Sequence, residues 1–292
     1  MRRAASSLVA CALIVAGCGG GGSGGNSGPA SPEEIPDATD PPAEVQRIRP
    51  AIRQGLALFS TEESLRGNES NVRINSDFSI GIETSSGLAR QYRRPALETE
   101  GMLAYVTDDF SDILIMNKPG EGLFGVFDLE YTSFGIWVET NVPDFSEEQD
   151  ARVTDAAAFL AVSATPAAQM PRTGDAYYIG GAFAVETEDR VYRNLLNGDT
   201  EAVIDFASGI LDYNIVFRDL DDVHWGKVQG RGFSISGNRF SKGVVTSDLG
   251  HKGGGSGRFG GPAAEEIVGT FAIKGPTTVN GSFGAQRLDL AD

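Results

Sequence analysis

The chain has 292 residues, and its 40% hydrophobic content is enough for one large or two modest globular domains. Its 24 Lys and Arg residues are outnumbered by 40 Asp and Glu residues, and the net charge of −16 argues against binding to the phosphate backbone of a nucleic acid. Both cysteines, Cys11 and Cys18, lie near the N-terminus, which excludes a disulfide framework. Only His224 and His251 could serve in histidine-dependent catalysis or metal binding, and this scarcity argues against many classes of enzyme.

The first 17 residues have the pattern of a secretory signal peptide. Arg2 and Arg3 precede an apolar run from Leu8 to Val15 that is too short to span a membrane as a helix. The following Ala16-Gly17-Cys18 resembles the end of the bacterial lipobox, in which the cysteine receives lipid, palmitate included, and becomes the new N-terminus. We therefore expect a lipoprotein signal peptide at residues 1–17 and lipid attachment at Cys18. The alternative is an ordinary signal peptide that contains a cysteine.

Residues 18–43 are predicted to be a disordered tether. They are rich in Gly and Ser and then in Pro, Asp and Glu, with no apolar periodicity. Such a segment cannot bury enough surface to offset the entropy lost on ordering. Residues 21–25 match the nucleophile-elbow pattern of hydrolases letter by letter, but without the strand and helix that the pattern requires on either side.

Residues 44–140 are predicted to form a small β-rich domain that begins with a helix. Apolar residues recur every three or four positions from Val45 to Phe59, which favours a short amphipathic helix over Glu44 to Ser60, interrupted or restarted at Pro50. Short runs rich in β-branched and aromatic residues follow, separated by turn residues. They predict strands at Val72–Ile74, Phe78–Ile82, Met102–Val106, Ile113–Met116, Leu123–Phe127 and Phe134–Val138.

Residues 141–164 are predicted to be a linker or a helix. The segment from Phe145 to Ala158 is acidic and then alanine-rich. Ser146, with Gln149 three residues later, makes a plausible helix start. A surface loop is the alternative.

Residues 165–292 are predicted to form an antiparallel barrel. From Ile210 to Phe217, apolar Leu211, Tyr213, Ile215 and Phe217 alternate with mostly polar residues, as expected of a strand with one buried face. About eight such strands are expected, the number at which side chains can just fill a closed barrel. The others fall at Tyr177–Gly181, Ala202–Phe206, Val228, Phe233–Ile235, Val244–Val245, Ile267–Ile273 and Ser282–Arg287.

The stretch from Gly257 to Gly269 separates two of these strands. Gly260-Gly261-Pro262 ends one strand, and we expect residues 263–266 to form a single helical turn that begins at Pro262. The pattern Phe-Gly-Gly-Pro-x-Ala-Glu-Glu-x-x-Gly-x-Phe over residues 259–271, followed by Gly281 to Arg287, resembles the barrel-domain signature of the transferrin-binding protein B family of bacterial surface lipoproteins. Thr165 to Gly181 resembles the barrel entry of that family.

The resemblance implies an all-β protein in which a C-terminal eight-stranded antiparallel barrel follows a smaller, handle-like β domain. Tyr131 to Trp137 looks like the strand that leads from handle to barrel. It further implies a lipid-anchored binding protein of the bacterial outer membrane or cell surface that captures host iron- or haem-carrier proteins. An enzymatic activity and a cofactor are not expected, and no motif identifies ligand-binding residues.

Several features of the sequence could carry chemistry. Asp219 to His224 places three carboxylates and an imidazole within six residues, but it lacks the loop of an EF-hand and reads as a solvated turn, so no metal site is expected. Residues 255–260 match the dinucleotide fingerprint by letter, but we interpret them as a flexible hairpin loop because no long helix follows. Neither histidine has the context of a serine triad, and Trp137 and Trp225 are expected in the core or at the barrel rim rather than in a ligand cage.

Two other functions stay open at this point. The barrel mouth could hold a small apolar or haem-like ligand, which would make the protein a carrier. The third function, an envelope hydrolase, would draw on the two histidines and on Asp219, Asp221 and Asp222. No catalytic residue is assigned, because nothing in the sequence selects one pair of acids.

Overall fold

The computed structural model describes residues 47, 59–64, 70–74, 79–84, 89–92, 97–99, 101–106, 112–118, 122–123, 127–140 and 152–288. These residues form β-strands and one short 3-10 helix, η2 (Ala167–Gln169), so the predicted all-β class is confirmed. In these ranges there is no helix long and apolar enough to cross a membrane.

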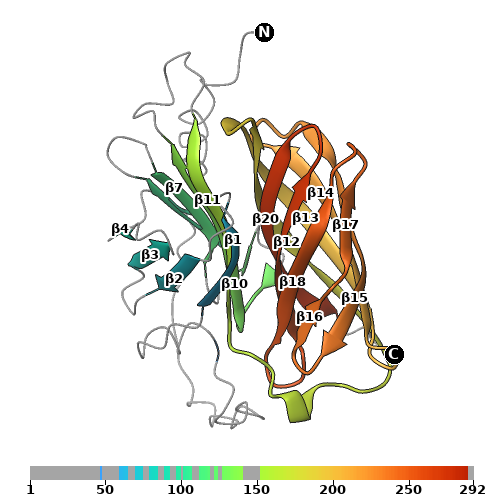
Figure 1. Cartoon of the computed structure of the whole chain (residues 1–292). Helices are drawn as coiled ribbons and strands as arrows, with labels where there is room; N and C mark the ends of the chain where they lie inside the picture. Colours follow the sequence, from blue (N-terminus) through green and yellow to red (C-terminus); the bar gives the residue numbers. More distant parts are fainter. Residues whose placement is uncertain are drawn as a thin grey trace, which may run out of the picture.

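The C-terminal half is the predicted eight-stranded antiparallel barrel (Figure 1). Two short strands, β16 and β17, both pair with β15 on one side and with β18 on the other. They are therefore two halves of one barrel strand, broken next to Lys242, where the backbone φ is 65°. The barrel strands are β12 (Asp175–Glu188), β13 (Val191–Asp205), β14 (Ile210–Asp219), β15 (His224–Ser236), β16 (Arg239–Ser241), β17 (Val244–Ser247), β18 (Lys252–Gly260), β19 (Glu266–Lys274) and β20 (Thr278–Leu288).

The barrel closes because its last strand pairs with its first. Each strand is hydrogen-bonded to the next in sequence, and β20 then returns to β12 in an unbroken register from Tyr177↔Leu288 to Thr187↔Thr278. Neither β12 nor β20 is left as an open edge, which removes the unpaired N–H and C=O groups that an edge strand exposes. The prediction that Ser282–Arg287 forms a paired final strand is confirmed.

Aromatic side chains fill the barrel interior. In β14 the predicted alternation is confirmed, because Leu211, Tyr213, Ile215 and Phe217 are each at most 1% exposed. Around them pack rings from several strands, with the Tyr213 ring centroid 4.6 Å from that of Phe283. At Gly230 an added Cβ would lie 2.2 Å from the Tyr213 ring, so only glycine leaves room for that ring.

The segment from Gly260 to Glu266 closes the end of the barrel at which η2 lies. Ala264 is fully buried in the barrel core, and its carbonyl accepts the hydroxyl of Tyr178 from inside β12. Arg287 donates to the Ala263 carbonyl (2.9 Å) through its side chain and to the Glu265 carbonyl (2.7 Å) through its backbone. This end of the barrel is thereby tied to both its first and its last strand.

The N-terminal half contributes a separate six-stranded antiparallel sheet, ordered β1-β11-β10-β7-β6-β5. A three-stranded sheet (β2-β3-β4) and a two-stranded one (β8-β9) accompany it. The strands are β1 (Phe59–Ser64), β2 (Ser70–Ile74), β3 (Ile80–Thr84), β4 (Ala89–Tyr92), β5 (Leu97–Thr99), β6 (Met102–Val106), β7 (Asp112–Asn117), β8 (Gly122–Leu123), β9 (Phe127–Asp128), β10 (Thr132–Thr140) and β11 (Val153–Val162).

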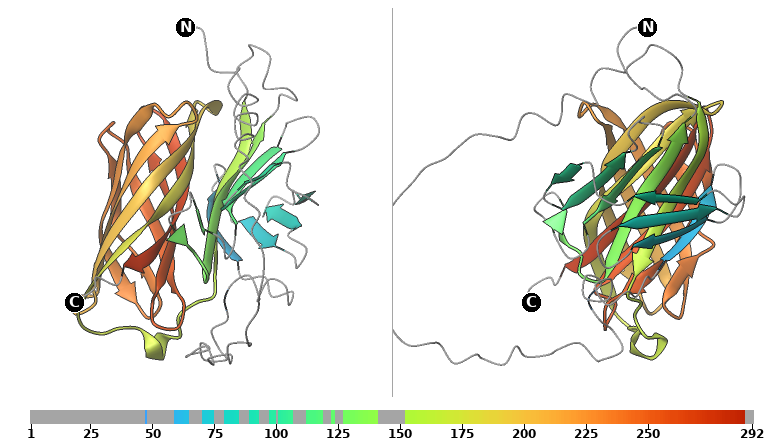
Figure 2. Two further views of the ribbon diagram at one scale, coloured as in Figure 1. Left: turned by 180° about the vertical axis from the view of Figure 1, so that it is seen from behind. Right: turned by 90° about the vertical axis from the view of Figure 1, so that its left-hand side faces the viewer.

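The six-stranded sheet packs one face against the outer wall of the barrel (Figures 1 and 2). Phe134, Ile136 and Val138 of β10 point toward the barrel, whereas Trp137 points to the other face and donates to the Tyr92 hydroxyl (3.1 Å). At Gly284 of β20 an added Cβ would lie 2.6 Å from the Phe134 ring, so glycine permits the close approach. The barrel side of this contact is supplied by Phe183, Val185, Leu195 and Val268.

Several sequence-based expectations need correction. Residues 153–158, for which a helix was favoured, lie in β11, because pairing with β10 and β1 outweighs the helix propensity of alanine. Phe59 and Ser60, placed in the first predicted helix, begin β1; Ser146, Gln149 and most of that first helix lie outside the described residues. Residues 261–264 form a turn in place of a helical turn, with Ala264 at a φ of 61°.

A buried carboxyl group joins the two halves. Glu266, the first residue of β19, is 2% exposed and accepts hydrogen bonds from the backbone N–H groups of Glu130 (2.6 Å) and Tyr131 (3.1 Å) and from the Thr132 hydroxyl (2.8 Å). Burial raises the pKa of Glu266 to about 8, because desolvation disfavours the charged form by more than the three donors favour it. The start of β10 is thus fixed to the start of β19.

We expect Glu266→Ala to lower the free energy of unfolding by about 3 kcal/mol or more. The substitution leaves up to three donors unpaired at a buried contact, and each unpaired buried donor costs about 1–3 kcal/mol. Glu266→Gln, which keeps the size and an acceptor oxygen, should lose much less. Denaturant unfolding of the three proteins at one pH checks this. Equal stabilities for the Ala and Gln variants would contradict it.

Glu266 should also make stability depend on pH. Its pKa is raised in the folded state, so the folded protein holds this proton more tightly than the unfolded chain. The resulting stabilisation is present below about pH 4.5 and is lost as the pH rises through about 8. The unfolding free energy of wild type should therefore fall relative to that of Glu266→Gln as the pH rises, when both are measured at a series of pH values. A constant difference between them would contradict the assignment.

Candidate binding surface

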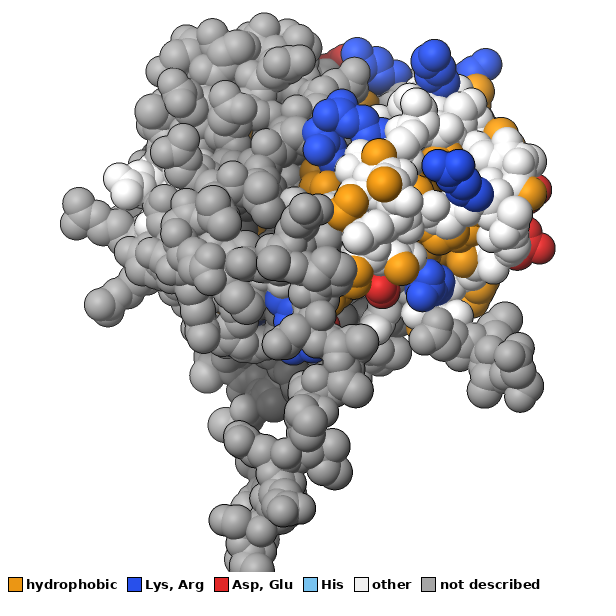
Figure 3. All heavy atoms as spheres, turned by 90° about the horizontal axis from the view of Figure 1, so that it is seen from below, with side chains coloured by type: hydrophobic (Ala, Val, Ile, Leu, Met, Phe, Trp, Pro, Cys, Tyr) orange, Lys and Arg blue, Asp and Glu red, His pale blue; other side chains and the backbone are white. Residues whose placement is uncertain are grey.

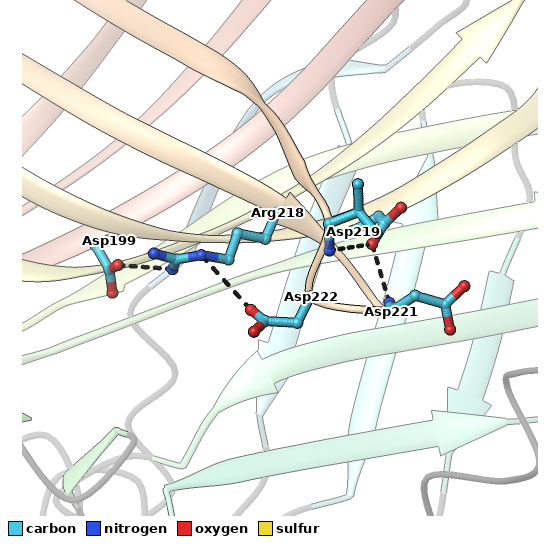
Figure 4. Close-up of polar contacts among 6 residues, drawn as sticks. Asp199, Arg218, Asp219, Asp221 and Asp222 are labelled. Carbon is cyan, nitrogen blue, oxygen red and sulfur yellow. Dashed lines mark hydrogen bonds and ion pairs between the residues drawn. The ribbon is translucent and has the colours of Figure 1, made fainter.

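The aspartate-rich turn between β14 and β15 is organised by the side chain of Asp219 (Figure 4). Asp219 Oδ1 accepts the N–H groups of Asp221 (3.0 Å) and Val223 (2.9 Å). Arg218 pairs with Asp199 across to β13 (3.0 Å) and with Asp222 (3.5 Å). Across the part of the chain that the structure describes, no group of three or more His, Cys, Asp or Glu residues is placed to hold a metal ion. The carboxylate of Asp219 stabilises the turn, and that of Asp222 pairs with Arg218.

His251 is buried at the same end of the barrel, in a polar network that the sequence did not reveal. Its Nδ1 lies 2.7 Å from Ser247 Oγ, and its Nε2 lies 2.7 Å from Thr277 Oγ1. Thr277 donates its hydroxyl to Glu186 (2.8 Å), so it accepts from Nε2, which leaves Nδ1 to accept from Ser247. The network needs a neutral imidazole.

The network does not have the arrangement of a serine triad. Ser247 Oγ also accepts the backbone N–H groups of Leu249 and His251, both at 3.2 Å, as in a turn stabilised by a serine side chain. Trp225 donates its indole N–H to Glu186 (3.0 Å), and its ring centroid lies 5.6 Å from that of His251. Trp225 packs against the barrel core and Trp137 is fully buried, so both tryptophans occupy core or rim positions, as expected. His224, by contrast, is exposed at the start of β15.

A groove of about 410 Å³ lies on the outside of the barrel, where β18 and β19 approach β11 of the six-stranded sheet. Gly255–Gly260, expected to be a flexible loop, is part of strand β18. The groove was missed because its residues come from separate strands that only cross-strand register brings together. Its lining includes Ala158, Lys252, Gly254, Ser256, Ala272 and Lys274.

Burial lowers the pKa of the His251 imidazole below its ordinary value, and the nearby Glu186 carboxylate raises it by less. The folded protein therefore binds this proton less readily than the unfolded chain, and stability should fall as the pH drops below about 6.5. We expect melting temperatures of wild type to fall more between about pH 7.5 and pH 5 than those of His251→Gln. His224→Gln, which removes an exposed histidine, is the matched control and should behave as wild type. Identical pH profiles for wild type and His251→Gln would contradict the assignment.

The barrel is similar to the barrels of a known protein family. Residues 170–287 match the family model described as the C-lobe and N-lobe β-barrels of Tf-binding protein B, where Tf denotes transferrin. No curated protein sequence matches the chain.

Solved structures of transferrin-binding protein B are similar to the chain at low identity. A double mutant of the Haemophilus parasuis Hp5 protein has 20% identity over 75% of this chain and 44% of its own, with a TM-score of 0.47. The isotype 1 protein of serogroup B Neisseria meningitidis has 16% identity over 80% of this chain and 44% of its own, also with a TM-score of 0.47. The N-lobe of Moraxella bovis lactoferrin-binding protein B has 14% identity over 65% of this chain and 80% of its own, with a TM-score of 0.39.

The chain spans less than half the length of the Haemophilus and Neisseria proteins. The matched residues, 170–287, contain every strand of the closed barrel apart from the last residue of β20 and include the segment that seals its end. The C-terminal barrel of this chain, over residues 170–287, is therefore similar to the β-barrels of the transferrin-binding protein B family.

Proposed function

We propose that this chain is a lipid-anchored binding protein of the bacterial outer membrane or cell surface, and that it captures a host iron- or haem-carrier protein. The family match of the barrel over residues 170–287 carries the proposal. In this proposal residues 1–17 are removed, Cys18 carries the lipid, and residues 18–43 tether a handle domain (44–140), a connecting segment (141–164) and the barrel domain (165–292). Transferrin is the first partner to test, because the related barrels belong to transferrin-binding proteins.

The packing of the barrel favours a macromolecular partner over a small ligand held inside. Rings of Tyr213, Phe233, Phe240 and Phe283 pack against one another in the interior, with centroids 4.6–6.4 Å apart. A carrier of an apolar or haem-like molecule would need that space. Contacts with a partner therefore have to come from the outer walls and loop ends, as in a protein–protein interface.

Binding to carrier proteins tests the proposed function directly. The purified full chain should bind iron-loaded transferrin, lactoferrin or a haem carrier in a saturable manner, with a dissociation constant of about 1 μM or tighter. The measurement is biolayer interferometry with each carrier immobilised in turn, and serum albumin on a parallel sensor as the control for nonspecific binding. Absence of saturable binding to every carrier tested would overturn the proposal.

Lipid attachment has its own test. After growth with labelled palmitate, wild-type protein should carry label and fractionate with membranes, whereas Cys18→Ser should be unlabelled and extract into the aqueous phase, since it lacks the acceptor thiol. Cys11→Ser is the matched control, because it removes the other cysteine of the chain and should keep both label and membrane location. A membrane-bound Cys18→Ser protein would show that the anchor lies elsewhere.

A further inference from the structure

The two halves of the barrel wall differ in charge. Strands β12, β13 and β14 contain eight Asp and Glu residues and two arginines. Strands β15, β16, β17 and β18 contain no Asp or Glu, and their five basic residues are Lys227, Arg231, Arg239, Lys252 and Arg258. Strand β19 adds Lys274, and its only acid is the buried Glu266. In a chain with a net charge of −16, one side of the barrel is therefore basic.

The basic residues of this wall point outward. Their neighbours Val228, Phe240, Phe259 and Ile273 point into the barrel core, and side chains alternate along a strand. Figure 3, which views the molecule from below relative to Figure 1, looks onto the end of the barrel and shows Lys and Arg side chains there among mostly uncharged described residues. We call the outer surface of β15 to β19 the basic wall.

Like charges face each other directly on the basic wall. Lys252 and Lys274 are cross-strand partners in the register of β18 with β19, and Arg239 and Arg258 are partners in that of β16 with β18. Like charges directly opposite each other destabilise a sheet. Within the described ranges Lys252 and Lys274 form no ion pair that would offset this cost. The arrangement is unfavourable in isolation and becomes favourable when an anion lies between the two ammonium groups.

The two lysines lie at the groove on the outside of β18 and β19. Between them and the six-stranded sheet, the outward cross-strand pairs are Gly254↔Ala272 and Ser256↔Thr270, which are small residues. The groove thus has two cationic side chains and a floor without bulky groups.

Nothing among the described residues requires glycine at position 254. Its φ is not positive, and an added Cβ would meet no atom of the described residues closer than 3.9 Å. Glycine weakens a strand, and within one it often marks a place where another backbone approaches closely. Gly253 and Gly255 differ, because a Cβ on either would collide with backbone carbonyls of β19 at 1.9 and 2.4 Å.

We propose that the basic wall, centred on the groove at Lys252 and Lys274, binds an extended acidic polypeptide segment. Its carboxylates would lie between the paired lysines, and its backbone would pass over Gly254. A polypeptide fits better than a membrane surface, because the two lysines line a groove that a chain can enter and a flat bilayer cannot. The acidic strands β12–β14 lie across the barrel from β18 in strand order, and charges farther apart than the screening length of about 8 Å at physiological salt interact little.

This inference does not rest on the lipid anchor or on an iron carrier as partner, so it can fail or succeed apart from the proposed function. The probe is a synthetic Glu-rich peptide, titrated into the purified full chain at low and physiological salt, with a Gln-rich peptide of the same length as the uncharged control. We expect saturable binding of the Glu-rich peptide only, weakening as salt rises.

Four variants locate the binding. Lys252→Gln with Lys274→Gln should weaken binding about tenfold or more, whereas Lys252→Arg with Lys274→Arg should retain it. Arg193→Gln with Arg218→Gln is the matched control: it removes the same charge from β13 and β14, where each arginine pairs with an acid, and should change affinity by no more than about twofold. Gly254→Val should obstruct the groove and weaken binding without lowering the melting temperature.

Two results would overturn the proposal. One is equal loss of binding in the Lys252/Lys274 and Arg193/Arg218 Gln variants, which would indicate a response to net charge alone. The other is binding to phosphatidylglycerol vesicles without binding to the peptide, which would assign the basic wall to a lipid surface.

Discussion

The structure depends on one long-range pairing, that of β20 with β12. These strands are the last and the first of the barrel, and their hydrogen bonds convert an open meander into a closed cylinder. An open meander would expose two edge strands and leave its aromatic interior in contact with water. The six-stranded sheet also relies on this closure, because Phe183 and Val185 of β12 and the close approach at Gly284 of β20 form part of the surface on which it packs.

The segment from Phe259 to Phe271 has two physical roles. Its turn seals one end of the barrel through Ala264 and the bonds to Tyr178 and Arg287. Its second glutamate, Glu266, receives the donors at the start of β10 and so fixes the other sheet against the barrel. A short motif can therefore specify both a closed barrel and a docked neighbour, which explains why it is informative in sequence although it carries no chemistry of its own.

Because side chains fill the barrel, its outer surface is the part of the barrel that another molecule can contact. Side chains occupy the interior. At one end of the barrel, the residues considered for metal binding or catalysis form a turn stabilised by Asp219 and a hydrogen-bond network around a neutral His251. The remaining distinctive feature is the uneven distribution of charge around the wall. Such a distribution gives a binding protein orientation and specificity even when its overall charge is strongly negative.

The sequence by itself determined the all-β class, the closing strand and the buried face of β14, because alternation and turn residues are local signals that the chain carries at each strand. The prediction of a helix around Ala156–Ala158 was wrong because local signals there are misleading. The alanines favour a helix locally, and only pairing with β10 and burial against the barrel make the segment a strand. Glu266 with Thr132, His251 with Thr277, and Lys252 with Lys274 could not be paired from sequence, because cross-strand register and sheet packing decide which distant residues meet. Those contacts were fixed only by the tertiary structure.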